Sequence, residues 1–280
     1  MAKPALKGGK VLNIDDRDFH RLRSYMQENF GLNLEKKRIL IEGRLSNTVI
    51  QAGFDNFTDF LDDVFGDKSG LKVDNLISRL TTNYTYFMRE EAHYRFMMQT
   101  ALPEWVKKIK DSDLRIWSAG CSSGEEPYTT AMMLEEFFGL SKKGWDTTIL
   151  ATDISPKVLA AAREGIYRQE LLERLPAGWK GRYFVKADPG RWKIKPFLAK
   201  EVIFNQFNLM GSFHSFRRKF HIIFCRNVMI YFKDKTKAEL TAKFYEVLEP
   251  GGYLFIGLSE TLSGVNSNFI QMSPSIYQKP

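Results

Sequence analysis

The chain has 280 residues, of which 44% are hydrophobic, and a formal net charge of +8. This length allows one large α/β domain, or a small domain joined to a medium one. No run approaches the roughly 18 apolar residues that cross a membrane, and the polar start at Met1 lacks a hydrophobic signal region, so we expect a soluble, cytoplasmic protein. Two distant cysteines, Cys121 and Cys225, are too few for a disulfide framework.

The excess positive charge is concentrated in one short segment. Residues 180–201 carry seven Lys or Arg residues and two acidic ones, whereas residues 1–80 carry 13 and 12. This distribution suits a solvated basic loop or an acidic partner, and it is not the continuous stripe typical of nucleic-acid binding. The four histidines are scattered, so the sequence predicts no metal site.

Residues 1–14 are predicted to be a flexible lead-in, and residues 15–80 a small all-helical domain. Apolar side chains recur there at helical spacing, and Gly31 is a good terminator for the first helix. The helices are expected over residues 19–30, 35–51, 57–65 and 71–80. Ile50 is expected on the inward face of the second one.

Residues 81–95 are predicted to link this domain to a larger one, residues 96–280. The segment begins with Thr81-Thr82-Asn83, which is poor helix material, and enters a helix near Arg89. Its hydrogen-bonding side chains stand beside aromatic ones, which a plain linker would not need. We therefore expect the linker to contribute to a binding site.

The most informative stretch, Trp117–Tyr128, is typical of a strand, a glycine-rich turn and the start of a helix. Gly120 and Gly124 let the backbone approach a ligand closely, and the helix N-terminus offers free N–H groups. The pattern is neither the dinucleotide-binding fingerprint nor a phosphate loop. Glu125 and Glu126 would repel a phosphate, so a ligand with a cationic or hydroxyl-bearing end suits this turn better.

The rest of the chain predicts alternating strands and helices with one insertion. Residues 147–153 read as the second strand, and Asp153 at its end stands where Rossmann-like sites hold ribose hydroxyls. Residues 167–200 interrupt the order as an inserted antiparallel β-subdomain with a turn at Asp188-Pro189-Gly190. Further strands are expected over residues 202–209, 220–225, 253–257 and 269–277, and helices over 156–164 and 234–248, the last capped by Asp234.

Polar residues follow several of these apolar runs, at the positions where strands end. Ligands of open α/β sheets lie at the carboxyl ends of the strands, so these residues are expected to gather around one site. They are Gly120, Glu126, Asp153, Asn208, Arg226 and Asn227.

Five sequence blocks carry a resemblance to a known family. They are Thr81–Glu90, Trp117–Tyr128, Ala151–Asp153, Phe207–Leu209 and Ile223–Phe232. In order and spacing they resemble the signature blocks of the chemotaxis receptor methyltransferases, the CheR family. The resemblance implies an α/β fold: a Rossmann-like S-adenosylmethionine-dependent methyltransferase domain with a small N-terminal all-helical domain and an inserted antiparallel β-subdomain. It also implies methylation of chemoreceptor glutamates to glutamyl methyl esters in chemotaxis adaptation, with S-adenosylhomocysteine as the other product.

The resemblance assigns roles to individual residues. Asp153 is expected to bind the ribose hydroxyls. The methionine part is expected to be held by Asn83, Thr85, Arg89 and Glu126. The adenine and sulfonium side is expected to be lined by Asn208, Leu209, Cys225 and Arg226, with Gly120 and Asn227 also at the cofactor. Arg89 and Tyr231 are expected nearest the transferred methyl group, as the catalytic residues.

The residue chemistry agrees with such a reaction. Glu126 could pair with an ammonium group, and a carboxylate nucleophile is already ionised at about pH 7, so no strong general base is required. The main task is to align an oxygen with a methyl group and to exclude water. Arg89 could hold the carboxylate through two hydrogen bonds, and Tyr231 could orient it through its hydroxyl.

A basic surface is expected to meet the acidic cytoplasmic helices of methyl-accepting chemotaxis receptors. The candidates are Lys36, Lys37, Arg38 and Arg44 on the second helix. In some members of the family the β-subdomain grips a receptor C-terminal peptide, but the turn at Asp188 is short for that type, so no such tether is expected. We expect a monomer that neither binds nucleic acid nor inserts into a membrane.

Three other functions stay open at this point. A nucleic-acid methyltransferase would keep the cofactor and explain the charge, although Arg226-Asn227-Val228-Met229 is not the loop that amino-group methylation of DNA commonly uses. A non-catalytic S-adenosylmethionine sensor is a second alternative, which the intact catalytic pair disfavours. A hydrolase is a third, because Gly120–Gly124 matches the Gly-x-Ser-x-Gly elbow and is followed by Asp153 and by His214 or His221.

Overall fold

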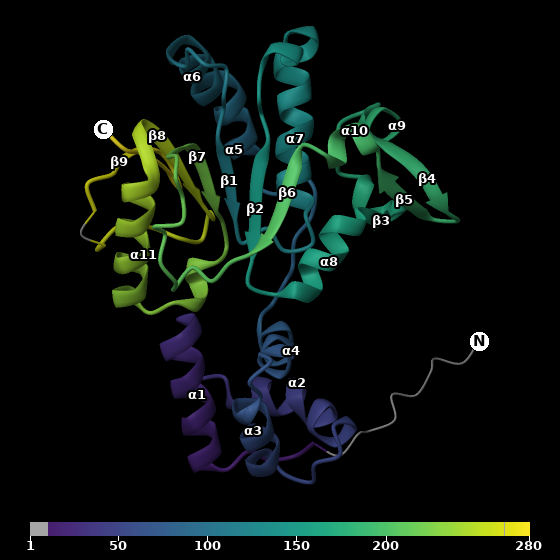
Figure 1. The fold of residues 1–280 in the computed structure, drawn as a ribbon, viewed down its shortest axis with the longest axis vertical. Helices are drawn as coiled ribbons and strands as arrows, with labels where there is room; N and C mark the ends of the chain where they lie inside the picture. Colours follow the sequence, from purple (N-terminus) through teal and green to yellow (C-terminus); the bar gives the residue numbers. More distant parts are fainter. Residues whose placement is uncertain (1–10, 266) are drawn as a thin grey trace. The chain divides into compact units, whose positions relative to one another are not determined.

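The computed structural model describes residues 11–265 and 267–280, and the chain divides into two compact units between Thr82 and Asn83 (Figure 1). Within these described ranges, the first unit is helical and the strands belong to the second. None of the helices in the described residues has the length and apolar character of a membrane-spanning segment.

The helices of the first unit begin and end at capping residues. They are α1 (Asp16–Phe30), α2 (Arg38–Gln51), α3 (Phe57–Gly66) and α4 (Leu71–Leu80). Asp15 caps α1 by accepting a hydrogen bond from the Asp18 N–H at 2.7 Å. Gly31 ends this helix in the left-handed conformation, with φ 71°, as the sequence predicts.

Two details of α2 differ from the prediction. The helix begins at Arg38 rather than Glu35, because the Asn33 side chain accepts a hydrogen bond from the Glu35 N–H at 3.2 Å and holds that stretch in a turn. Ile50 is 43% exposed rather than inward-facing. It follows the buried Val49, and consecutive helical residues point about 100° apart, so both cannot face the same core.

The second unit is built on a seven-stranded sheet with the order β6-β2-β1-β7-β8-β10-β9. Its strands are β1 (Ile116–Ala119), β2 (Ile149–Asp153), β6 (Val202–Gln206), β7 (Phe220–Cys225), β8 (Leu248–Ile256), β9 (Ile270–Ser273) and β10 (Ile276–Gln278). The first five in the sheet pair in parallel and the last two antiparallel. The chain runs outward from β1 to β6 and then crosses to β7, so the strand order reverses between β1 and β7. A ligand of an open sheet binds at such a reversal, beside the carboxyl ends of the strands.

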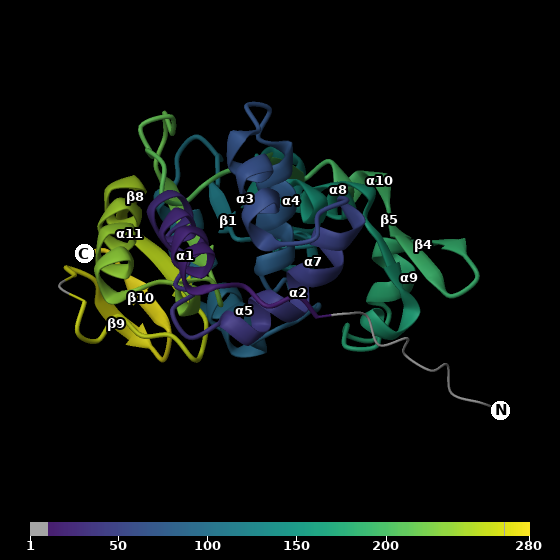
Figure 2. The same ribbon diagram turned by 90° about the horizontal axis from the view of Figure 1, so that it is seen from below.

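Helices pack against this sheet (Figures 1 and 2). The helical elements of this unit outside the small antiparallel sheet are α5 (Glu91–Phe96), the π-helical turn η1 (Met97–Ala101), α6 (Leu102–Lys108), α7 (Glu125–Phe138), η2 (Gly139–Gly144), α8 (Pro156–Glu164), η4 (Met229–Tyr231) and α11 (Asp234–Val247). Alternate residues of β1 point to opposite layers. Ile116 shares a buried cluster with Tyr94 and Met132, whereas the Trp117 ring lies 5.5 Å from that of Phe244 in α11.

A three-stranded antiparallel sheet, the β-subdomain, lies beside α7 and α8 (Figure 1). It contains β3 (Ile166–Arg168), η3 (Gln169–Leu172), α9 (Trp179–Tyr183), β4 (Phe184–Asp188), β5 (Arg191–Ile194) and α10 (Pro196–Ala199). The hairpin predicted around Pro189 is confirmed, and β3 adds a strand that was not predicted. The Phe184 ring anchors the sheet through an edge contact with Phe87, at 5.6 Å between centroids.

The C-terminal elements correct three predictions. Residues 269–277 form the hairpin β9–β10 instead of one strand, because Ser275 takes a φ of 58° and turns the chain. β8 begins at Leu248 rather than at residue 253, and its pairing with β7 is locally irregular. Asp234 is the first residue of α11 rather than its cap, and the cap position falls on Lys233.

Candidate active site

The turn between β1 and α7 has the backbone that a closely approaching ligand needs. Gly120 takes a φ of 103°, and its N–H donates to the Thr152 carbonyl at 2.8 Å. A β-carbon at Gly120 would lie 2.4 Å from Cγ2 of Val228, so no other residue fits without a shift. Gly124 is also left-handed, with φ 94°, and precedes the first residue of α7.

Asp153 lies at the end of β2, beside this turn. Its Oδ2 accepts a hydrogen bond from the Ser122 N–H at 2.9 Å, and its Oδ1 accepts one from the Ser155 N–H at 3.0 Å. Burial raises the pKa of this carboxyl group above its ordinary value, although the backbone donors oppose the shift. Each oxygen keeps a further lone pair, so the carboxylate can also accept hydrogen bonds from a hydroxyl-bearing ligand.

A buried group of charges lies at the ends of β1 and β7. The Arg226 side chain is 2% exposed, and its Nε lies 3.2 Å from Oε2 of Glu126 and 3.4 Å from Oε2 of Glu90. The Ser118 hydroxyl donates to Oε1 of Glu126 at 2.7 Å. Burial raises the pKa of Glu126, against the opposing effect of the guanidinium. Two acids share one arginine, so the ionised group keeps a net negative charge, which suits an ammonium ligand.

The segment before α5 joins this site through its backbone. The Asn83 carbonyl accepts a hydrogen bond from the Ser122 hydroxyl at 3.1 Å, and the Arg89 carbonyl accepts one from Nη2 of Arg226 at 2.6 Å. The Arg89 side chain turns back along its own segment, where Nη1 donates to the Tyr84 carbonyl at 2.7 Å. Thr85 is half-buried in the same segment. The part of the predicted linker from Asn83 onward therefore contacts the residues of the candidate site.

Backbone strain gathers around the same place. Six described residues other than glycine have a positive φ. Four of them belong to the site: Met88 (61°), Glu90 (57°), Ser122 (49°) and Asn227 (59°). Left-handed backbone costs about 1–2 kcal/mol per residue, and it persists where surrounding contacts impose it, as at functional sites.

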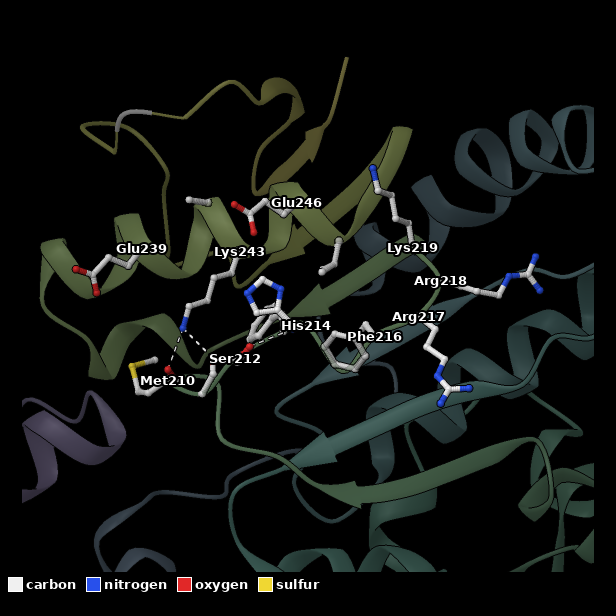
Figure 3. Close-up of a pocket in the computed structure, with 14 residues that line it drawn as sticks. Met210, Ser212, His214, Phe216, Arg217, Arg218, Lys219, Glu239, Lys243 and Glu246 are labelled. Carbon is white, nitrogen blue, oxygen red and sulfur yellow. Dashed lines mark hydrogen bonds between the residues drawn. The ribbon is translucent and has the colours of Figure 1, made fainter.

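The segment after β6 is held by a lysine of α11 (Figure 3). β6 ends at Gln206, so Asn208 lies in a turn rather than in the predicted strand, where its Oδ1 accepts a hydrogen bond from the Met210 N–H at 2.9 Å. Lys243 Nζ donates to the Met210 carbonyl at 2.9 Å and lies 3.4 Å from that of the buried Leu209. These contacts fix the backbone that carries both predicted residues.

A cleft of about 820 Å³ adjoins this lysine, between α11 and the segment before β7 (Figure 3). Its lining is mixed in charge, with Arg217 and Lys219 opposed by Glu239 and Glu246. None of the predicted cofactor-binding residues lines it. The cleft is therefore not the site predicted from the sequence.

The turn after β7 carries three more predicted residues. Cys225 ends the strand fully buried, and burial raises the pKa of its thiol well above the usual value. Asn227 donates from Nδ2 to Oε1 of Glu90 at 3.3 Å, while its buried Oδ1 has no hydrogen-bond partner among the residues that the structure describes. Tyr231 is half-buried at the end of η4.

Two acids of this region escaped the sequence prediction. Glu90 contacts Arg226 and Asn227, and Glu260 accepts hydrogen bonds from the backbone of the turn after β7. Glu260 follows the last parallel strand, so the rule that strand ends collect polar groups could have found it. No sequence pattern indicates Glu90, because its contacts depend on a left-handed backbone conformation that the sequence does not predict.

The geometry contradicts the hydrolase alternative. The Ser122 hydroxyl donates to the Asn83 carbonyl and not to a histidine. His221 lies at the start of β7, where Nδ1 accepts a hydrogen bond from the Arg115 N–H at 2.9 Å, whereas Ser122 follows the end of the parallel strand β1. His221 and Ser122 thus lie at opposite ends of these two neighbouring strands. His214 lines the separate cleft.

The fold and the site together define a class of protein. A parallel sheet whose order reverses beside a glycine turn, with an acid at the end of the second strand, is the Rossmann-like fold of an S-adenosylmethionine-dependent methyltransferase. Residues 83–277 match the family model described as the SAM binding domain of CheR methyltransferase, and residues 17–81 match its all-alpha domain. The chain belongs to the CheR methyltransferase family.

Curated relatives resemble the whole chain. The chemotaxis protein methyltransferase of Borreliella burgdorferi is 43% identical over 272 residues, which are 96% of this chain and 96% of that protein. Chemotaxis protein methyltransferase 1 of Pseudomonas aeruginosa is 36% identical, over 95% of this chain and 98% of that protein. The Escherichia coli chemotaxis protein methyltransferase is 33% identical, over 95% and 92%. The likeness favours a protein methyltransferase over the nucleic-acid alternative.

The cofactor of this family is S-adenosylmethionine, and the residues present fit it. Its ammonium group suits the net negative charge around Glu126, and its ribose hydroxyls suit the lone pairs of Asp153. The unpartnered Oδ1 of Asn227 offers a further buried acceptor. A phosphate-bearing cofactor would instead be repelled by the carboxylates of Glu90, Glu126 and Asp153.

Proposed function

We propose that this protein is a cytoplasmic enzyme that methylates glutamate side chains in the cytoplasmic helices of chemoreceptors. The products are glutamyl methyl esters and S-adenosylhomocysteine. Family membership and the relatives named as chemotaxis protein methyltransferases support this proposal. The observation that carries it is the convergence of Glu126, Arg226 and Asp153 beside the left-handed Gly120, which fits a cationic, hydroxyl-bearing methyl donor.

Each predicted site residue has a proposed task. Asp153 holds the ribose hydroxyls. The methionine end is held by Asn83, Thr85, Arg89 and Glu126, and the adenine and sulfonium side by Asn208, Leu209, Cys225, Arg226 and Asn227, while Gly120 admits the cofactor to the turn. Arg89 and Tyr231 act on the substrate carboxylate.

The proposed reaction is a displacement in which no proton moves. The bound cofactor supplies a methyl group on a positively charged sulfur. One oxygen of the receptor glutamate would form the new C–O bond as the C–S bond of the cofactor breaks, with the electron pair left on sulfur. Because the carboxylate is already ionised at about pH 7, the chain contributes alignment and exclusion of water. Arg89 donates to the Tyr84 carbonyl through Nη1 and has further N–H groups with which to bind the carboxylate, and Tyr231 orients the carboxylate through its hydroxyl.

Mass spectrometry of receptor peptides tests the chemistry directly. After incubation of purified protein with S-adenosylmethionine and a receptor cytoplasmic fragment, methyl increments should map to glutamates on helices. Increments confined to lysine, arginine or cysteine would contradict the proposal.

The proposed receptor-docking surface is narrower than the four residues predicted. Lys36 and Lys37 precede α2 and are exposed. Arg38 instead donates to the Ile14 carbonyl at 3.2 Å, and Arg44 donates to the Leu80 carbonyl at 2.8 Å, at the end of α4. Two arginines thus have structural tasks within the helical unit, and we assign docking to the lysines.

Charge reversal at Lys36 and Lys37 should weaken receptor binding without slowing the reaction. We expect the Lys36→Glu/Lys37→Glu variant to raise the KM for receptor about 5- to 20-fold, because attraction to an acidic helix becomes repulsion. The kcat should stay unchanged. Lys68→Glu, another exposed lysine of the same unit, is the control. Equal KM values for all three proteins would contradict the assignment.

Cofactor binding should weaken as the pH falls. Burial raises the pKa of Glu126, so it takes up a proton at a higher pH than an exposed glutamate and then no longer attracts an ammonium group. The Kd for S-adenosylhomocysteine should therefore rise from pH 8 to pH 5, with release of a proton on binding at the acid end. Calorimetry in buffers of different ionisation enthalpy measures both. Glu126→Gln should flatten the profile, and a flat profile in the wild type would rule the idea out.

A further inference from the structure

The Glu260 carboxylate is surrounded by backbone donors from two loops. Its Oε2 accepts hydrogen bonds from the N–H groups of Gly257 at 2.5 Å and Asn227 at 2.9 Å. Its Oε1 accepts one from the Ile230 N–H at 3.0 Å. Three charge-assisted bonds to one carboxylate fix the turn after β7 at both of its ends.

The two loops can approach only because Gly257 has no side chain. A β-carbon there would lie 2.4 Å from Nδ2 of Asn227 and 2.8 Å from Oε2 of Glu260. The turn is also strained, since Asn227 has a φ of 59°. Strain of this kind needs contacts that impose it, and Glu260 supplies them at the strained residue itself.

The Glu90 carboxylate also connects the loop after β7 to the loop after β8. Oε1 of Glu90 accepts hydrogen bonds from the Leu258 N–H at 3.2 Å and from Nδ2 of Asn227 at 3.3 Å. Glu90 does not reach the far end of the turn, where Ile230 precedes Tyr231. Among the residues that the structure describes, Glu260 is the one whose side chain accepts a hydrogen bond from the Ile230 N–H.

We infer that Glu260 is a positioning residue, which sets the turn from Asn227 to Tyr231 and thereby places the Tyr231 hydroxyl for methyl transfer. This inference rests on the proposed function. It separates two tasks in one turn. Arg226, at its start, is held by Glu90 and Glu126, whereas the end that carries Tyr231 depends on Glu260.

The separation predicts a selective kinetic defect in Glu260→Gln. An amide of the same shape can accept from the Gly257 side but presents an NH₂ group to the Ile230 N–H, so that end of the turn is released. We expect kcat at saturating receptor to fall about 10- to 100-fold, with the Kd for S-adenosylhomocysteine changed less than about threefold. Glu104→Gln is the matched control. The Glu104 carboxylate is partly buried and accepts a hydrogen bond from the Tyr253 hydroxyl at 2.7 Å, away from the turn.

A double-mutant cycle with Tyr231→Phe shows whether Glu260 acts through Tyr231. The double variant should be no more than about threefold slower than Tyr231→Phe alone. If Glu260 acts only by placing the Tyr231 hydroxyl, its loss has little further effect once that hydroxyl is gone. All proteins are assayed well below their unfolding midpoints, and Glu260→Ala repeats the cycle if the glutamine variant folds poorly. Additive losses, or a kcat no lower than that of Glu104→Gln, would overturn the inference. A wild type without methyl transfer would instead refute the proposed function.

Discussion

Replacing Arg89 with alanine should abolish most methyl transfer while leaving the fold intact. The guanidinium donates a hydrogen bond to the Tyr84 carbonyl at 2.7 Å, so its removal should cost no more than about 1–2 kcal/mol of stability. The tie between Arg226 and this segment uses the Arg89 carbonyl and survives the substitution. Loss of the group that aligns the carboxylate should lower kcat/KM about 100- to 1,000-fold.

The matched control is Arg95→Ala, which removes an arginine from the next helix. Arg95 lies 3.6 Å from Glu91 at the surface, far more exposed than the site residues. This variant should keep wild-type kcat/KM and unfold within about 3 °C of the wild type, whereas Arg89→Ala should unfold no more than about 8 °C below it. Receptor methylation by Arg89→Ala at the wild-type rate would remove Arg89 from the catalytic assignment.

The Gly120→Ala substitution should eliminate cofactor binding and destabilise the second unit. Alanine would have to adopt a φ of 103° and place its methyl group 2.4 Å from Cγ2 of Val228. Left-handed strain of about 1–3 kcal/mol and overpacking of similar size act together. We expect a loss of about 2–4 kcal/mol in unfolding free energy and at least a 100-fold weaker Kd for S-adenosylhomocysteine, measured by denaturation and calorimetry.

A second substitution separates strain from crowding. In Gly120→Ala/Val228→Ala the clash is gone but the left-handed backbone remains, so about half of the lost stability should return. Val228→Ala alone should cost less than about 1.5 kcal/mol. If Gly120→Ala binds the cofactor as tightly as the wild type, the turn does not approach the ligand in the way we describe.

Much of the fold could be predicted because its signals are local. Apolar runs such as Phe220–Cys225 and the glycine turn of Trp117–Tyr128 specify strand, turn and helix within a few residues. The misplaced boundaries have equally local causes that pattern does not reveal. An Asn33 turn delays α2, and a left-handed Ser275 divides the last strand into a hairpin.

The site was predictable where residues stand at strand ends and unpredictable where long-range contacts decide. Asp153 and Arg226 follow apolar runs, so the sheet brings them to one edge. The carboxylates of Glu90 and Glu260 accept hydrogen bonds from loops far apart in the chain. The sequence gives no signal for Glu90, and although Glu260 follows a strand, its position in the sequence does not show which loop it contacts. The prediction for Arg44 was wrong for a different reason. Its basic side chain suggested a docking residue, but the guanidinium donates hydrogen bonds to the carbonyls at the end of α4.

One measurement tests the central claim most directly. The purified protein is incubated with methyl-labelled S-adenosylmethionine and with chemoreceptor-containing membranes from the organism that the protein comes from. The receptor band is then treated with base. We predict label on the receptors that base releases as volatile methanol, as a glutamyl methyl ester requires, and almost none with Arg89→Ala. Label that resists base, or that appears on nucleic acid instead of receptors, would contradict the account.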